Sequence, residues 1–343
     1  MSLSRTSLLR SLLVLAIFYI SYQAFEVFLP IILAIVIAFI LNPFVNWLVN
    51  HLSIGRRKFP RSIAALMSMI VSFTLFASII SFVFLPFVTE FNKFVQNLPA
   101  IAAQLHDLSL VIGERTNSLD LPNNIRSILD QTLSSVASFS MDFAKRIIWT
   151  AFSVASRVIE LVVIPVLVYY FLKDGEVMQQ AVINLFTANY RVLARTILQE
   201  MAVTIGAYIH GQVLISIIMS AMVFSGLYIM GVDYPLVIAL LAFLTETIPI
   251  VGPIIGAVPA VLLAYLISPA LALKVTVFYI VVHQLDSHVI VPNIMGHTIA
   301  LHPVVVIISV LVAAQLFGII GMILAVPVAA LLRIFIRHLQ IVG

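Results

Sequence analysis

One carboxylate followed by five helix-disturbing residues forms the most unusual segment of this chain. Glu246 opens the segment inside an otherwise apolar run, and the residues that follow it are Pro249, Gly252, Pro253, Gly256 and Pro259. Each proline lacks an amide donor and clashes with the carbonyl one turn back. Transporters use a broken helix and a buried acid to build sites near the bilayer midplane. The segment therefore predicts a coupling or substrate site; the alternative is a kinked structural helix with a satisfied acid.

A second polar cluster, at residues 283–288, reads His-Gln-Leu-Asp-Ser-His. Residues two apart on a helix do not share a face, so only His283 and Asp286, three apart, can converge. We therefore expect no metal site here. We predict a polar helix face that lines a pathway, with Gln284 and Asp286 on the same route as Glu246. The alternative is the polar end of a helix at the membrane interface.

Three smaller features leave alternatives open. Arg157 and Glu160 are three apart and can pair, which favours a structural ion pair. His210 is interpreted as a hydrogen-bonded core histidine rather than a proton relay. Gly318 and Gly321 permit either close helix packing or a second helix break, which would make a re-entrant element.

The composition is typical of a membrane protein. Hydrophobic residues make up 62% of the chain, charged residues only 9%, and the mean hydropathy is +1.18. Cysteine is absent, which excludes disulfides and cysteine nucleophiles. The chain has no phosphate-binding glycine loop, HExxH motif or nucleotide fingerprint. We therefore predict no enzyme activity, no cofactor, no metal and no nucleic-acid partner; the expected partners are the lipid bilayer and a small-molecule or ion substrate.

Long apolar runs predict an all-α polytopic fold with about eight transmembrane helices, because roughly 20 residues cross ~30 Å of hydrocarbon. The predicted spans are residues 8–25, 27–49, 62–88, 147–172, 201–230, 234–267, 270–291 and 302–336. The sixth and eighth spans are long, which suits a tilted, bent or re-entrant path. The sixth contains the break after Glu246.

Two segments between the spans are predicted to lie outside the bilayer. Residues 90–146 have apolar residues at helical spacing, which predicts an extracytoplasmic amphipathic helical hairpin. Residues 173–200 predict a cytoplasmic helical connection that begins with a Lys-Asp-Gly turn. The predicted organisation is N-terminal helices in 1–89, the insert in 90–146, helix four in 147–172, the connection in 173–200, and C-terminal helices with the transport site in 201–343.

Basic residues predict the orientation. With both termini in the cytoplasm, the short outside loops at residues 26, 231–234 and 292–301 contain no lysine or arginine. The inside segments then contain Arg5, Arg10, Arg56, Arg57, Lys58, Arg61, Lys173, Arg191, Arg195, Lys274, Arg333 and Arg337. This asymmetry satisfies the positive-inside rule.

At several of these residues the chain resembles the autoinducer-2 exporter family of bacterial membrane proteins. The matching segments, in chain order, are residues 29–34, 41–43, 169–174, 246–253, 284–296, 301–303 and 318–327. The number and order of these matches make the resemblance specific. It implies a multi-span carrier or exporter of the inner membrane that assembles as a homo-oligomer, a pentamer.

Family members are associated with export of autoinducer-2 or with sodium/proton antiport, and both activities remain open. We predict an inner-membrane secondary transporter that exports a small polar signal or metabolite such as autoinducer-2. Glu246 is the predicted coupling carboxylate, and an unwound backbone around Pro249, Gly252 and Pro253 is predicted to face the pathway. The alternatives are a sodium/proton antiporter, a channel-like or scaffold protein, and a membrane enzyme.

Overall fold

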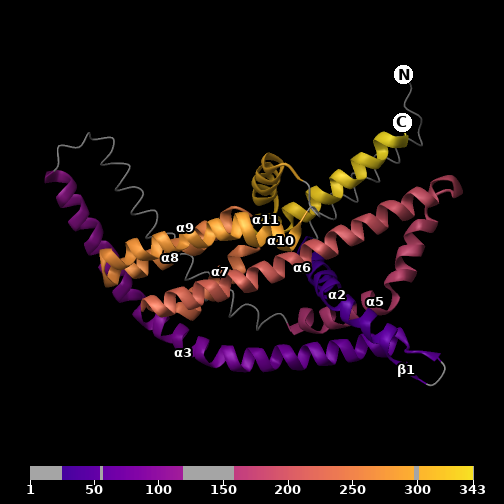
Figure 1. Cartoon of the computed structure of the whole chain (residues 1–343), viewed down its shortest axis with the longest axis horizontal. Helices are drawn as coiled ribbons and strands as arrows, with labels where there is room; N and C mark the ends of the chain where they lie inside the picture. Colours follow the sequence, from indigo (N-terminus) through magenta and orange to yellow (C-terminus); the bar gives the residue numbers. More distant parts are fainter. Residues whose placement is uncertain (1–24, 55–56, 119–157, 297–300, 343) are drawn as a thin grey trace. The chain divides into compact units, whose positions relative to one another are not determined.

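The computed structural model describes residues 25–54, 57–118, 158–296 and 301–342 (Figure 1). The chain forms two compact units, which are described separately below. The first unit comprises Met1–Thr74 and Ser153–Leu185, and the second comprises Leu75–Phe152 and Phe186–Gly343.

The described residues confirm an all-α polytopic fold. The helices are α2 (Phe25–His51), α3 (Arg61–Ser118), α5 (Val158–Asn184), η1 (Ala188–Tyr190), α6 (Arg191–Met230), α7 (Pro235–Glu246), α8 (Val251–Ile267), α9 (Pro269–Leu285), the π-helix η2 (Asp286–Ile290), α10 (Val291–Met295) and α11 (Pro303–Val342). A short antiparallel ribbon, β1 (Ser53–Ile54) and β2 (Arg57–Lys58), joins α2 to α3.

Five described segments are long and apolar enough to cross a membrane. They are Leu29–His51, Arg61–Ile79, Ala188–Met230, Pro269–Met295 and Pro303–His338. These match the second, third, fifth, seventh and eighth predicted spans. The predicted sixth span is divided into the shorter apolar helices α7 and α8. The predicted first span lies outside the described residues, and the predicted fourth span is described only from the start of α5.

Two predicted boundaries differ from the structure. α3 runs without interruption through the predicted start of the external insert at residue 90, and the second half of that insert lies outside the described residues. α5 likewise continues through the predicted Lys-Asp-Gly turn to Asn184. The prediction of a turn at these residues was therefore wrong. Glycine in a helix costs only about 1 kcal/mol. Burial of Leu172 and Ile183 on either side of Gly175 offsets this cost.

Small side chains let three helices pack closely in the first unit. Its buried core contains Ala34, Ala38, Val45 and Leu48 of α2, Ala64 and Ala65 of α3, and Val168 and Leu172 of α5. Small residues of this kind allow helix backbones to approach one another in membrane proteins. The N-terminal part of α3 is thereby held against α2 and α5.

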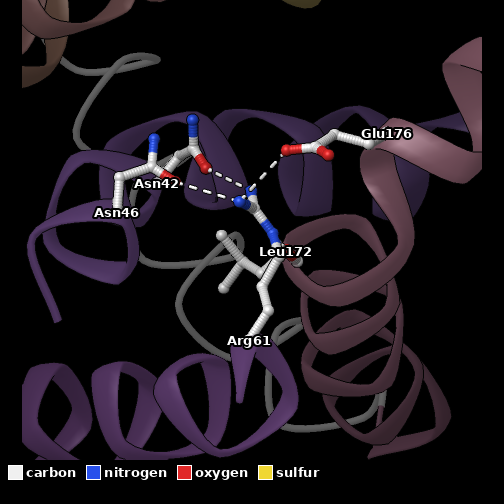
Figure 2. Close-up of polar contacts among 5 residues, drawn as sticks. All are labelled: Asn42, Asn46, Arg61, Leu172 and Glu176. Atoms are coloured by element: carbon white, nitrogen blue, oxygen red, sulfur yellow. Dashed lines mark hydrogen bonds and ion pairs between the residues drawn. The ribbon is translucent and has the colours of Figure 1, made fainter. Parts of the chain in front are cut away.

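Arg61, the first residue of α3, joins the same three helices through its guanidinium group (Figure 2). Its Nε donates to the Leu172 carbonyl oxygen of α5 at 2.8 Å. Its Nη1 and Nη2 donate to the side-chain oxygens of Asn46 and Asn42 on α2, each at 3.1 Å. A longer ion pair of 3.4 Å reaches the exposed carboxylate of Glu176. The planar fork of donors in arginine suits such a set of acceptors.

Helices α6 to α9 form the core of the second unit. Consecutive helices pack against each other, and α8 and α9 run side by side (Figure 1). The buried side chains of this core are Val223, Leu227, Val232, Ile238, Ala239, Ala242, Ala260, Leu263, Ala264, Ala272 and Val275. Phe94 and Ile101 of α3 pack against the same core. The second half of α3 therefore covers the end of the bundle at which α7 begins.

Glu90 of α3 caps the N-terminus of α7. Its Oε1 accepts a hydrogen bond of 3.2 Å from the backbone amide of Leu236. Next to this contact, Asn97 donates to the Tyr234 hydroxyl at 2.7 Å, and the Phe94 ring packs edge-on against the Tyr234 ring. The first amides of a helix have no partner within the helix, so an oxygen supplied by another helix satisfies one of them.

The Glu90 cap gives a pH-dependent prediction. Glu90 lies beyond the membrane-crossing part of α3; burial raises its pKa above 4.5, while the Leu236 amide and Lys93 oppose the shift. Because the folded pKa exceeds the unfolded one, this group's contribution to stability is lost as pH rises through the folded pKa. Glu90→Gln keeps the acceptor oxygen without the charge. We therefore expect Glu90→Gln to melt at or slightly above the wild-type temperature at pH 7.5. The difference between the two melting temperatures should become smaller toward pH 4.5.

Glu90→Ala is the matched control for this prediction, because it removes the acceptor as well as the charge. Loss of a helix cap costs about 1 kcal/mol, so the alanine variant should melt below wild type at both pH values. The melting temperature of each purified variant is measured by heating samples and quantifying the protein that remains folded by size-exclusion chromatography. Equal destabilisation by glutamine and alanine would show that the charge, rather than the acceptor, stabilises α7.

Candidate functional site

The break after Glu246 turns the predicted sixth span into a helical hairpin. α7 ends at Glu246, residues 247–250 are non-helical, and α8 begins at Val251. Ile250 adopts a positive φ of 70°, which is rare for a β-branched residue. α7 and α8 pack against each other, and Gly252 lies directly against the Thr245 carbonyl. With 12 residues α7 is about 18 Å long, so it ends part-way through ~30 Å of hydrocarbon.

Glu246 lies at the tip of this hairpin and is 7% exposed. Its backbone oxygen accepts a 2.7 Å hydrogen bond from the Gln212 side chain of α6. The last carbonyls of a helix lack partners within the helix, so Gln212 satisfies one of them. Pro249 belongs to the unwound segment, whereas Gly252 and Pro253 form the first turn of α8. The unwound backbone is therefore shorter than the sequence predicted.

Asp286 is the second buried carboxyl of the site. It is 6% exposed, lies where α9 passes into the π-helix η2, and comes close enough to Glu246 for the two charges to interact. Its Oδ1 has no hydrogen-bond partner in the described part of the chain. Asp286 also interacts electrostatically with His283, the convergence expected from their spacing. π-Helical turns often occur at functional sites.

The structure does not bring all the predicted site residues together. Gln284 is exposed, although Asp286 two residues later is buried. The backbone carbonyl of Gln284 accepts a hydrogen bond from the His288 ring at 3.1 Å. Arg157 lies outside the described residues, and the side chain of Glu160 does as well, so their ion pair stays a prediction. His210 donates from Nδ1 to the Gly206 carbonyl at 2.6 Å, whereas its buried Nε2 has no partner among the described residues, so its role stays a prediction. No cluster of three potential metal ligands occurs among the described residues.

α11 contains a second helix break, at Gly318. This glycine has φ 61° and ψ −142° inside the run Pro303–Val342. Gly321 lies against the carbonyl of Ala313, although residues eight apart in a straight helix are separated by about 12 Å. The chain therefore folds back at Gly318, as the helix-break alternative predicted, and Gly321 allows the two arms to pack closely.

The two broken helices touch each other. Ile248, in the unwound segment after Glu246, is buried in one cluster with Val310 from the arm before Gly318 and Ala325 from the arm after it. Sequence spacing gave no signal of this contact, since the three residues are ordinary apolar residues in two separate runs. The tip of the α7–α8 hairpin thus packs against both arms of α11.

A cavity of about 430 Å³ lies beside Glu246 between helices α6 to α9. Most of its lining is apolar. The polar lining residues are Thr245, Glu246, Thr276, Tyr279 and His283. Thr276 and Tyr279 escaped the sequence analysis because each is a single polar residue in an apolar run. Gln212 could have been found as one of the few amides within a predicted span.

A polytopic helical protein with two buried carboxyls at a discontinuous helix has the architecture of a membrane transporter. The family model described as "AI-2E family transporter" matches residues 11–341. The chain therefore belongs to the AI-2E family of membrane transporters.

Several curated proteins resemble the chain over nearly its full length. YrrI of Bacillus subtilis (strain 168) is 29% identical over 316 residues, which are 91% of this chain and 86% of YrrI. YueF of the same organism is 28% identical over 93% of this chain and 87% of YueF. PerM of Escherichia coli (strain K12) is 27% identical over 90% of this chain and 86% of PerM. Their names are provisional, as transport proteins or a permease, and specify no substrate.

Proposed function

We propose that this AI-2E family member is a secondary transporter whose coupling site is the carboxyl pair Glu246 and Asp286. The observation that carries the proposal is the burial of two interacting acids from different helices. Neither acid forms a salt bridge with a described lysine or arginine. Burial of two like charges is costly unless a proton or another cation neutralises part of the charge. A site whose occupancy by such a cation changes is what a gradient-driven carrier requires.

Export of a small polar signal or metabolite is the first substrate hypothesis, and autoinducer-2 is the candidate that the family resemblance supplies. Sodium/proton antiport is the second, and the same pair of acids supports it because two carboxyls can exchange a proton for a sodium ion. In both cases the hairpin tip provides a physical route for conformational change. Movement at Ile248 is transmitted to both arms of α11, because this side chain packs on both.

We further propose that the transporter lies in the bacterial inner membrane as a homo-oligomer, a pentamer, with both termini in the cytoplasm. Treating α7–α8 and α11 as re-entrant hairpins removes two crossings, so the C-terminus stays on the side that the basic residues predict. Lys274 at the start of α9 is then the one basic residue of the predicted inside set that moves to the outside.

Flux measurements on purified protein in proteoliposomes test the proposed function. The assays compare autoinducer-2 efflux with sodium-driven proton movement, for wild type, Glu246→Gln and Asp286→Asn. We expect gradient-coupled flux in wild type and a loss of at least about tenfold in either variant, because each removes a group that binds the coupling cation. Gln284→Ala, at an exposed position beside the pair, is the matched control and should retain flux. Undiminished, equally pH-dependent flux in Glu246→Gln would contradict the proposal and favour a channel or scaffold.

A further inference from the structure

The cavity beside Glu246 has a chemistry that selects one class of ligand. We propose that it binds a small amphipathic monocation, an ammonium group attached to an apolar body, in preference to anionic or polyhydroxylated solutes. This inference rests on the proposed function, because it takes Glu246 as the ligand-facing group of the transport site. It names a substrate class that differs from the small polar solute of the first substrate hypothesis, and the binding assay below decides between the two.

Four of the five polar residues around the cavity are arranged to accept hydrogen bonds; the fifth, His283, carries an N–H donor and interacts with Asp286. A hydroxyl has a single hydrogen to donate. Thr245 directs its hydrogen to the Ala242 carbonyl at 3.3 Å, Thr276 to the Ala272 carbonyl at 2.8 Å, and Tyr279 to the Gly256 carbonyl at 3.4 Å. Each hydroxyl oxygen can therefore only accept a hydrogen bond from a ligand. The Glu246 carboxylate is also an acceptor.

A cation with several donors matches these acceptors. An ammonium group has three donors and no acceptor, so none of its atoms is left without a partner at such a site. Its charge complements Glu246 and the nearby Asp286, and no lysine or arginine is among the residues that line the cavity. The Tyr279 ring can add a cation–π contact. An anion would meet two acids, which opposes its binding.

The remainder of the cavity requires an apolar body. Val223, Val258, Leu262 and Ile280 are among the apolar side chains that line it. A volume of about 430 Å³ is within the range of small-molecule sites and far larger than an inorganic ion needs. Several ligand hydroxyls would be costly here, since their oxygen lone pairs would face apolar side chains without donors.

Binding of radiolabelled phenethylammonium to the full-length protein in nanodiscs tests the inference. 2-Phenylethanol and phenylacetate have the same ring and carbon chain with a neutral or negative end, so they separate charge recognition from apolar partitioning. We expect saturable binding, competition by 2-phenylethanol at least about tenfold weaker than by unlabelled phenethylammonium, and no competition by phenylacetate. Equal competition by the alcohol, or non-saturable binding, would overturn the inference.

Variants locate the ligand in the cavity. Ala257→Phe fills the cavity without altering a polar group, and we expect it to weaken binding at least about tenfold. Ala221→Phe, the same substitution on the exposed side of α6, should bind as wild type. Thr276→Val replaces an acceptor oxygen with a methyl group of the same shape, and it should weaken binding even if Ala257→Phe does not fold. Wild-type binding by both Ala257→Phe and Thr276→Val would overturn the assignment.

Failure of the inference and failure of the proposed function give different results. Glu246-dependent flux of another solute without phenethylammonium binding would overturn the ligand class and leave the transport function standing. The opposite result is also informative. If phenethylammonium binding is saturable and depends on Glu246, but flux is unaffected by Glu246→Gln, the binding site is supported and its role in transport is overturned.

Discussion

Gly252→Ala is expected to prevent the α7–α8 hairpin from closing and thereby to destabilise the transporter severely. A Cβ atom at residue 252 would overlap the carbonyl oxygen of Thr245, which is backbone and cannot move aside as a side chain can. Overpacking in a closely packed region typically costs 1–3 kcal/mol, and a backbone obstacle leads us to expect about 3 kcal/mol or more. The variant should melt several degrees below wild type and lose gradient-coupled flux, because Glu246 stands next to Thr245.

Gly256→Ala is the matched control for this prediction, with the same substitution one turn further along α8. Its Cβ would lie 3.3 Å from the Thr245 hydroxyl, a side-chain atom rather than backbone. Alanine is also a better helix former than glycine by about 1 kcal/mol, which offsets the tight contact. We expect a melting temperature close to wild type. Equal losses in Gly252→Ala and Gly256→Ala would contradict the close approach at Gly252.

The helix break at the site could be predicted because its cause is local. Proline lacks an amide donor and disturbs a helix, and the sequence analysis located the break within a few residues of its position. Only Pro249 lies in the unwound segment, since Gly252, Pro253, Gly256 and Pro259 belong to α8. The convergence of His283 and Asp286 likewise followed from helical spacing. Proximity of Glu246 to Asp286 had a different origin. The sequence analysis placed the two acids on one route, but their proximity requires α8 and α9 to pack side by side, a tertiary contact that local spacing does not indicate.

Features that depend on long-range packing could not be predicted in the same way. Gly318 and Gly321 left close packing and a helix break as alternatives; the chain breaks at Gly318, and both arms of α11 pack against Ile248. Gly175 predicted a turn because glycine lowers helix propensity. Tertiary burial of Leu172 and Ile183 overrides that local preference. Leu236 and Glu90 are 146 residues apart, so no sequence pattern links the cap of α7 to α3.

Arg61→Ala is expected to loosen the first unit, since one guanidinium group binds acceptors on both α2 and α5 (Figure 2). Removal leaves the side-chain oxygens of Asn42 and Asn46 without this donor, and hydrogen bonds to charged groups contribute about 1.5–3 kcal/mol each in favourable settings. Only part of the summed hydrogen-bond free energy should be lost, because the Arg61 side chain is 28% exposed and water can replace some of its contacts. We expect a loss of roughly 2–3 kcal/mol in the free energy of unfolding.

Two controls separate the asparagine contacts from the ion pair. Glu176→Gln removes only the charge of a carboxylate that is 81% exposed, and surface pairs contribute about 0–1 kcal/mol, so it should melt near wild type. Arg61→Lys keeps the charge but lacks the planar fork, and it should fall between wild type and Arg61→Ala. A double-mutant cycle between Arg61→Ala and Asn42→Ala, followed by thermal melting, should show a coupling because the two side chains share a hydrogen bond. If Glu176→Gln costs as much as Arg61→Ala, the exposed ion pair rather than the helix-bridging hydrogen bonds would hold α3 to its neighbours.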